Sequence, residues 1–205
     1  MFETSWRYCW KSLSAKGSGC ELMEQLLDAY QEPQRKYHTQ QHLRECLGLM
    51  REHVDCAVEP AEVEMALWFH DAIYNIKASD NEARSAEWAV SELKKAGVVQ
   101  DRIDRIQAHI FATRHAALPQ GQDQKLLVDI DLSILGAAPS RFEEYEQQVR
   151  QEYSYVPGFI FRRKRRQLLS EFLARNPIFT TLVLRQKFEG QARRNISHSI
   201  TVLGG

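Results

Sequence analysis

The stretch EPAEVEMALWFHDAIYN, residues 59–75, joins a long apolar run to two adjacent ionisable residues, His70 and Asp71. Pro60 followed by glutamates is typical of a first helical turn, because proline lacks the N–H that would be unpaired there and acidic groups favour the positive end of the helix. The apolar residues that follow predict a helix buried on most of its sides. A buried carboxylate is costly without a partner, so Asp71 requires a cation, an arginine or a metal.

The helical spacing of apolar residues recurs along nearly the whole chain. "KLLVDIDL" is apolar enough for a buried strand, but it lies between helical segments and has no partner strands, so it is interpreted as helix. One all-α domain of about nine or ten helices is expected. The expected helices cover about residues 2–13, 20–30, 39–50, 59–74, 83–97, 100–115, 123–136, 140–157, 159–175 and 179–203.

Composition excludes several classes of protein. The 205 residues are 43 % hydrophobic and 26 % charged, which is ordinary for a globular chain. Lys+Arg and Asp+Glu both number 27, so nothing global attracts nucleic acid or an anionic membrane. No apolar run reaches membrane-spanning length and the N-terminus does not resemble a secretory signal, so a cytoplasmic location is expected. The 4 cysteines form no CxxC pair, which favours reduced, mostly packed thiols.

Two further segments place possible metal ligands in apolar surroundings. "YHTQQH" contains His38 and His42, four residues apart and therefore on one helix face. "LLVDIDLSILG" contains Asp129 and Asp131 inside another apolar run. Imidazole and carboxylate together are ligands of divalent metals, and a metal would neutralise the buried carboxylates. The alternative is a set of core histidines and carboxylates that are satisfied by their own surroundings.

The ordered set of a histidine, a His-Asp doublet and a distal aspartate resembles the HD-domain superfamily of metal-dependent phosphohydrolases. Its bacterial branch of predicted phosphohydrolases is similar in "YHTQQH", "ALWFHDAIYN", "DNEARSAEWA", "DIDLSILG", "VRQEY" and "EGQARRNI", from about Tyr37 to Ile196. The resemblance implies a helical bundle of the HD-domain type, with residues 1–205 as a single domain. The metal-site core would cover about residues 37–136, and C-terminal helices at 139–203 would pack on it.

Carried over to this chain, the resemblance implies one divalent metal ion, Mn, Fe, Co, Ni, Zn or Mg. Its ligands would be His42, His70, Asp71 and one aspartate of "DID". The family pattern points to Asp131, with Asp129 as the alternative. Such an ion would activate water to hydrolyse a nucleotide or another small phosphorylated substrate. Asp71 or a neighbouring carboxylate would take the proton.

Other residues near these motifs are candidates for catalysis or substrate binding. His38 is expected to support the site or contact substrate, and Arg114 and His115 are expected to reach an anionic group. Glu82 is a candidate catalytic residue, although the spacing of "SDNE" also suits the last position of a capping box. His109 and His115 do not share a helix face, which favours one metal over two, and both are otherwise expected to be exposed or near a helix end.

Three alternatives remain open at the level of sequence. The basic run "FRRKRRQLL", residues 161–169, is interpreted as binding nucleic acid or polyphosphate, or as a solvated helix face paired with Glu143, Glu144 and Glu152. The chain is interpreted as an enzyme, or as a non-catalytic HD module that binds a nucleotide and regulates a partner. Oxygenation by two irons is disfavoured, because histidines for a second metal are poorly placed.

Overall fold

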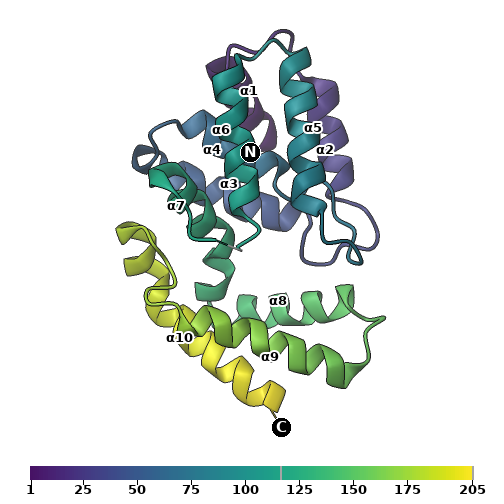
Figure 1. Cartoon of the computed structure of the whole chain (residues 1–205), viewed down its shortest axis with the longest axis vertical. Helices are drawn as coiled ribbons and strands as arrows, with labels where there is room; N and C mark the ends of the chain where they lie inside the picture. The colour runs from purple at the N-terminus through teal and green to yellow at the C-terminus, as the bar shows by residue number, and fades with distance from the viewer. Residues whose placement is uncertain (116, 205) are drawn as a thin grey trace. The chain divides into compact units, whose positions relative to one another are not determined.

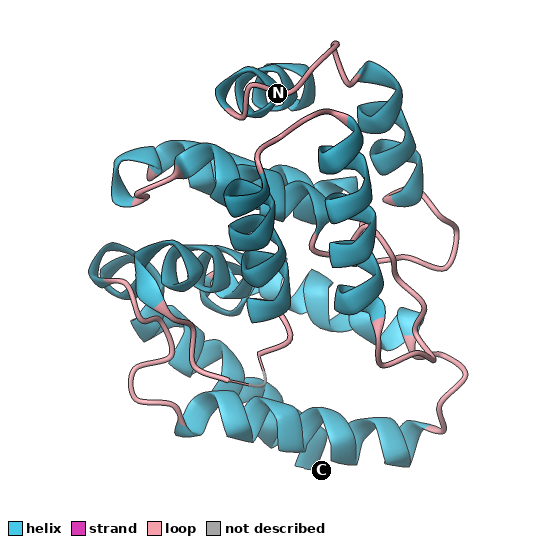
Figure 2. Ribbon diagram, turned by 45° about the horizontal axis from the view of Figure 1, so that its top comes forward, coloured by secondary structure: helices cyan, strands magenta, loops and turns pink. Residues whose placement is uncertain are grey.

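The computed structural model describes residues 1–115 and 117–204. Within these residues it contains ten α-helices, two short 3-10 helices and no strand (Figure 1, Figure 2). The all-α class expected from the helical spacing is therefore confirmed. The chain divides into two compact units, Met1–Val128 and Asp129–Gly205. A single domain of the HD type stays a prediction.

The first unit is organised around helix α4, which is the apolar run of the opening stretch. Its elements are α1 (Phe2–Ser12), α2 (Cys20–Ala29), α3 (Gln40–Glu52), η1 (Val54–Cys56), α4 (Pro60–Phe69), α5 (Asn81–Lys95), α6 (Gln100–Ala112) and the first part of α7 (Gly121–Asp131). α4 packs against α1, α3, α5 and α6. Every residue of α4 after Pro60 is buried, as its composition predicts.

Aromatic side chains fasten α1 to α4. The Trp6 ring stacks on Trp10 with centroids 5.1 Å apart and meets Trp68 edge-on, also at 5.1 Å. The indole N–H of Trp68 donates a 3.0 Å hydrogen bond to the hydroxyl of Ser5, which in turn donates to the carboxylate of Glu64. The four-residue spacing of the N-terminal tryptophans thus marks an interior face. Each buried aromatic ring contributes about 1.5–3 kcal/mol.

The second unit is built from the end of α7, η2 (Leu132–Gly136), α8 (Pro139–Glu152), α9 (Gly158–Ala174) and α10 (Leu182–Gly204). α9 packs along α10, and η2 packs on both α10 and α8. The approach of η2 to α10 is close, since a Cβ at Gly136 would lie 2.6 Å from that of Phe188. The side-chain amide of Asn195 donates to the carbonyls of Leu135 and Ala137, both at 2.9 Å, and so fixes this contact.

Asp129 holds the start of α10 in place. One carboxylate oxygen accepts from the backbone N–H and the hydroxyl of Thr180 at 2.9 and 3.2 Å. The other accepts from the same two groups of Thr181 at 2.6 and 2.7 Å. Burial raises the pKa of Asp129, although these hydrogen bonds oppose the shift. The carboxylate therefore satisfies the N–H groups that precede Leu182, which the helix itself leaves unpaired.

Two possible helix caps are not used. Ser140 begins the helix expected at 140–157 and is a residue type that suits an N-cap, but it lies inside α8, because Pro139 takes the first helical position and Ala138, which has no polar side chain, is the N-cap. Proline suits that position, since it has a helical φ and no N–H to satisfy. The capping box expected at Ser79 is also wrong, because the N-cap of α5 is Asp80, whose side chain makes no capping hydrogen bond.

The cysteines and the apolar character of the helices are as the sequence predicts. None of the four cysteines forms a disulfide; Cys9 and Cys46 are buried, Cys56 is partly exposed and Cys20 is exposed. Reduced thiols were expected from their spacing. Among the described residues, no helix combines the length and the apolar character that crossing a membrane requires.

We predict that replacing Glu64 by Gln makes stability less dependent on pH. Glu64 is only 5 % exposed, and burial raises its pKa. A carboxyl with a raised folded pKa stabilises the protein at low pH and loses that contribution as the pH rises through the folded value. Urea unfolding should show Glu64→Gln more stable than the wild type at pH 8, with the difference shrinking toward pH 4. Glu87→Gln, at an exposed position, is the control and should show no such trend.

Candidate metal centre

The His-Asp doublet lies at the end of a helix rather than inside one. α4 ends at Phe69, His70 is its C-cap, and Asp71 lies in the turn that follows. The expectation that the helix continues to Tyr74 is therefore wrong. The turn frees the carboxylate of Asp71 to point back toward the ring of His70, with Oδ2 3.1 Å from Nε2.

Arg35 joins the two turns that carry the candidate ligands. Its guanidinium donates to the carbonyls of Asp71 at 2.6 Å and Ala72 at 2.9 Å, after α4, and to the carbonyl of His38 at 3.2 Å, ahead of α3. Arg35 is 3 % exposed, and its guanidinium lies 5.3 Å from the centroid of the Tyr74 ring. No motif marks Arg35, so sequence reasoning missed it. Its planar fork of donors suits several carbonyls at once.

Three potential ligand atoms converge beside this turn, all in the first unit. Nε2 of His42 lies 3.1 Å from Nε2 of His70 and 3.6 Å from Oδ2 of Asp71. Nε2 of His70 and Oδ2 of Asp71 are 3.1 Å apart, so the three atoms form a compact triangle. Ligands about 2.0–2.2 Å from one ion are separated by about 3–3.6 Å at the angles usual for metals. The triangle therefore has the size of a metal-ligand set.

The histidine rings are oriented by their outer nitrogens. Nδ1 of His70 lies 2.8 Å from the carbonyl of Leu67, which requires that this nitrogen carry a proton and leaves the lone pair of the neutral ring on Nε2. Nδ1 of His42 lies 3.0 Å from the hydroxyl of Tyr37. Such outer hydrogen bonds are typical of histidines that bind metals, because they fix the ring and its tautomer.

The electrostatics of Asp71 favour a charged carboxylate. Its side chain is 19 % exposed, and burial by itself would raise its pKa. When the neighbouring His70 and His38 rings are protonated, their positive charges and the hydrogen bond that the His70 imidazolium donates more than offset burial and hold the pKa of Asp71 well below its usual range. Asp71 is therefore ionised at neutral pH, as a metal ligand must be.

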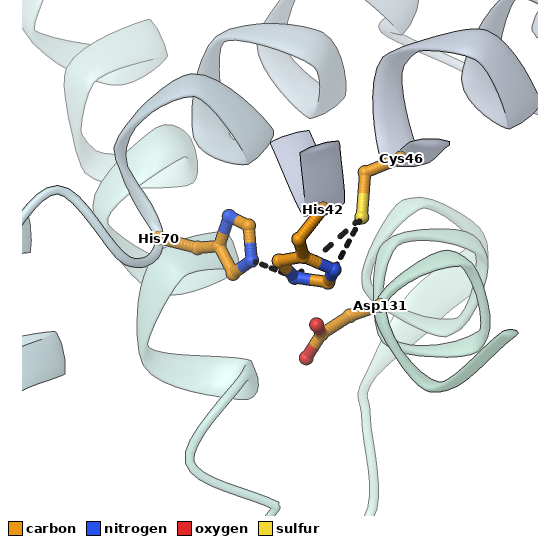
Figure 3. A group of neighbouring side chains, drawn as sticks. All are labelled: His42, Cys46, His70 and Asp131. Atoms are coloured by element: carbon orange, nitrogen blue, oxygen red, sulfur yellow. Dashed lines mark hydrogen bonds between the residues drawn. The ribbon is translucent and has the colours of Figure 1, made fainter. Parts of the chain in front are cut away.

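Cys46 is a fourth potential ligand that sequence reasoning missed. It lies one turn beyond His42 on α3, with Sγ 3.7 Å from Nδ1 and 3.8 Å from Nε2 of that ring. One ligand atom from each of His42, Cys46 and His70 lies within 4.8 Å of the others (Figure 3). Thiolate and imidazole are both zinc ligands, so the four-residue His–Cys spacing was the available signal. This buried group could hold a metal ion.

The two aspartates of "DID" have different positions. Asp131, also drawn in Figure 3, is the last residue of α7 and belongs to the second unit. Asp129 uses both oxygens to bond Thr180 and Thr181 in that same unit. A metal would have to compete with these donors for the oxygens of Asp129.

The other candidate residues are distributed around α5, α6 and the turn before α3. His38 stacks on Tyr74 with ring centroids 4.2 Å apart and lies 6.1 Å from the ring of His42. Glu82 occupies the second position of α5 rather than a capping box, and its carboxylate lies 3.9 Å from Nε of Arg114. The carboxylate of Glu82 is therefore not committed to capping the helix and could take part in a site.

The histidines considered for a second metal are placed differently from each other. His115 follows α6 and has a positive φ of 54°. His109 lies in the last turn of α6, near a helix end as expected, but it is only 6 % exposed, and neither ring nitrogen has a hydrogen-bond partner among the described residues. Burial lowers the pKa of His109, so the ring is neutral at pH 7.

Comparison with known proteins identifies no relative of this chain. No protein-family model matches the chain, and neither curated proteins nor solved structures give a significant match. Membership of the HD-domain superfamily thus remains an inference from the motifs in the sequence. The geometry of the candidate site has to be interpreted from its own chemistry.

We predict that Arg35→Lys destabilises the first unit by about 2 kcal/mol, because a buried ammonium cannot reproduce the guanidinium's bonds to three carbonyls. Urea unfolding followed by tryptophan fluorescence measures this, since the four tryptophans all lie in the first unit. Arg7→Lys, at an exposed position, is the matched control. Equal stability of the two variants would show that Arg35 does not hold the turns together.

Proposed function

We propose that this chain is a metal-dependent phosphohydrolase acting on a nucleotide or another small phosphoester. One observation supports this most directly: Nε2 of His42, Nε2 of His70 and Oδ2 of Asp71 lie within 3.6 Å of one another at a largely buried position. Two neutral imidazoles and an ionised carboxylate suit a divalent cation. The same residues are those that the resemblance to HD-domain phosphohydrolases assigns as ligands.

The fourth protein ligand is proposed to be Asp131. The family pattern points to it, and the carboxylate of Asp129 is already used at the start of α10. Cys46 is kept as an additional ligand for a metal that accepts sulfur, such as Zn²⁺. Oxygen and nitrogen ligands alone would suit Mn, Fe, Co, Ni or Mg as well.

A bound divalent ion would supply a Lewis acid that polarises the phosphoester and lowers the pKa of the attacking water. The chain's own residues have separate tasks. Asp71 and Glu82 are the carboxylates proposed to take the proton of that water. Arg114, which is near Glu82, is proposed to bind a phosphate oxygen, because guanidinium matches phosphate geometry. His38 and His115 are proposed as further substrate contacts.

We predict that His70→Ala and Asp71→Asn each lower the bound metal, measured by elemental analysis after loading with Mn or Zn, to below about a tenth of the wild-type content. Removing one of so few ligands leaves too few donors to hold an ion. Asp131→Asn should weaken metal binding at least tenfold. The control is His198→Ala, an exposed histidine of the second unit. Full metal content in His70→Ala and Asp71→Asn would exclude the proposed ligand set.

The activity is tested by measuring phosphate release from nucleotides and small phosphoesters in the presence of Mn, Co, Ni or Mg. We expect turnover of at least one substrate, and we expect it to disappear in His70→Ala. A protein that holds metal and binds nucleotide tightly but releases no phosphate would instead support the alternative, a non-catalytic HD module that regulates a partner.

A further inference from the structure

A pocket of about 450 Å³ lies in the second unit, remote in sequence from the candidate metal ligands of the first. One stripe of α9 forms most of its lining: Arg162 and Arg163 follow Phe159 by three and four residues, and Arg166 follows them by four and three. Leu203, near the end of α10, contributes apolar surface. Three guanidinium groups therefore share a pocket with an aromatic ring.

The pocket arginines are not neutralised within the chain. Arg162, Arg163 and Arg166 are exposed, and none forms an ion pair or side-chain hydrogen bond with a described residue. The sequence alternative of pairing with nearby glutamates is wrong for them. Arg165 is the exception in the run, because it turns inward and pairs with Glu146. The exposed cations are thus available for an external anion.

Charge is also divided unequally between the units. The second unit contains twelve Lys and Arg residues and eight Asp and Glu residues, a formal charge of +4. Because the whole chain is neutral, the first unit carries −4. The zero net charge that argued against anionic partners therefore hides a basic unit.

The chemistry of the lining defines the ligand class. Planar guanidinium groups bind phosphate oxygens in pairs, and three of them match a chain of phosphates better than a single one. Phe159 is 67 % exposed at the pocket, which leaves its ring face free to stack on a base. The volume falls within the range of about 300–1,000 Å³ typical of small-molecule sites. We propose that this pocket binds a nucleoside polyphosphate.

A free nucleotide fits these observations better than a strand of nucleic acid. The positive charge in the pocket is confined to Arg162, Arg163 and Arg166, and the lining continues beyond them with the neutral Gln167 and Ser170. A strand would need a longer basic track to follow its backbone. This assignment does not depend on the metal centre, so it stands or falls separately from phosphohydrolase activity.

Isothermal titration of the full chain with ATP and with inorganic tripolyphosphate, both in EDTA, tests the proposal. Arg162→Ala/Arg166→Ala should weaken both ligands at least tenfold. Phe159→Ala should weaken ATP severalfold and leave tripolyphosphate unchanged, because only the base contact is lost. EDTA removes divalent ions, so ATP binding in this titration does not require an occupied metal centre.

The matched control is Lys164→Ala/Arg194→Ala, which removes two exposed cations of the same unit that do not line the pocket. It should retain wild-type affinity for ATP. Absence of ATP binding by the wild type, or an equal loss in the control, would overturn the proposal. So would tighter binding of single-stranded oligothymidylate or of anionic phospholipid vesicles than of ATP. Circular dichroism establishes that each variant is folded, and Arg163→Ala replaces the double variant if that one is not.

Discussion

The candidate metal centre depends on one buried cation, the guanidinium of Arg35. Its donors reach the carbonyls of Asp71 and Ala72 on one side and that of His38 on the other, so two turns distant in sequence are held at a fixed separation. Two further hydrogen bonds hold the turn after α4, from the N–H of Asp71 to the hydroxyl of Tyr30 at 3.3 Å and from the N–H of Ile73 to the hydroxyl of Ser85 at 3.0 Å, but neither reaches the turn ahead of α3. A rigid frame matters because a metal ligand has to be placed to within a fraction of an ångström.

The same link explains where sequence reasoning succeeds and fails. The spacing of apolar residues predicted the helices because burial requires one apolar face for each helix, and the all-α fold follows from it. The end of α4 at Phe69 was not predictable, because the turn that carries Asp71 is held by a tertiary contact from Arg35. A buried arginine that bonds carbonyls carries no motif, since its partners are backbone atoms that any residue provides.

At the site, His70 and Asp71 could be selected from sequence because ionisable groups in apolar runs need a partner, whereas the choice of His42 over His38 came from the resemblance to the HD-domain superfamily. Cys46 was passed over because a buried cysteine is ordinarily a small apolar side chain. The charge division between the units was hidden for a similar reason, since composition averages a basic and an acidic unit to zero. In both cases the structure shows which residues lie together: Cys46 beside the histidines, and the basic residues in the second unit.

Asp129 sets a limit on changes in chain length. Its two oxygens serve four donors from Thr180 and Thr181, so its direction on α7 is fixed by the start of another helix. One residue inserted just after it, ahead of η2, would rotate the carboxylate by about 100° relative to η2, which packs on α10, and would leave those donors unpaired. Length variation is therefore better tolerated in the turn at 153–157 between α8 and α9 than around "DID", where the register of a single residue determines how two helices meet.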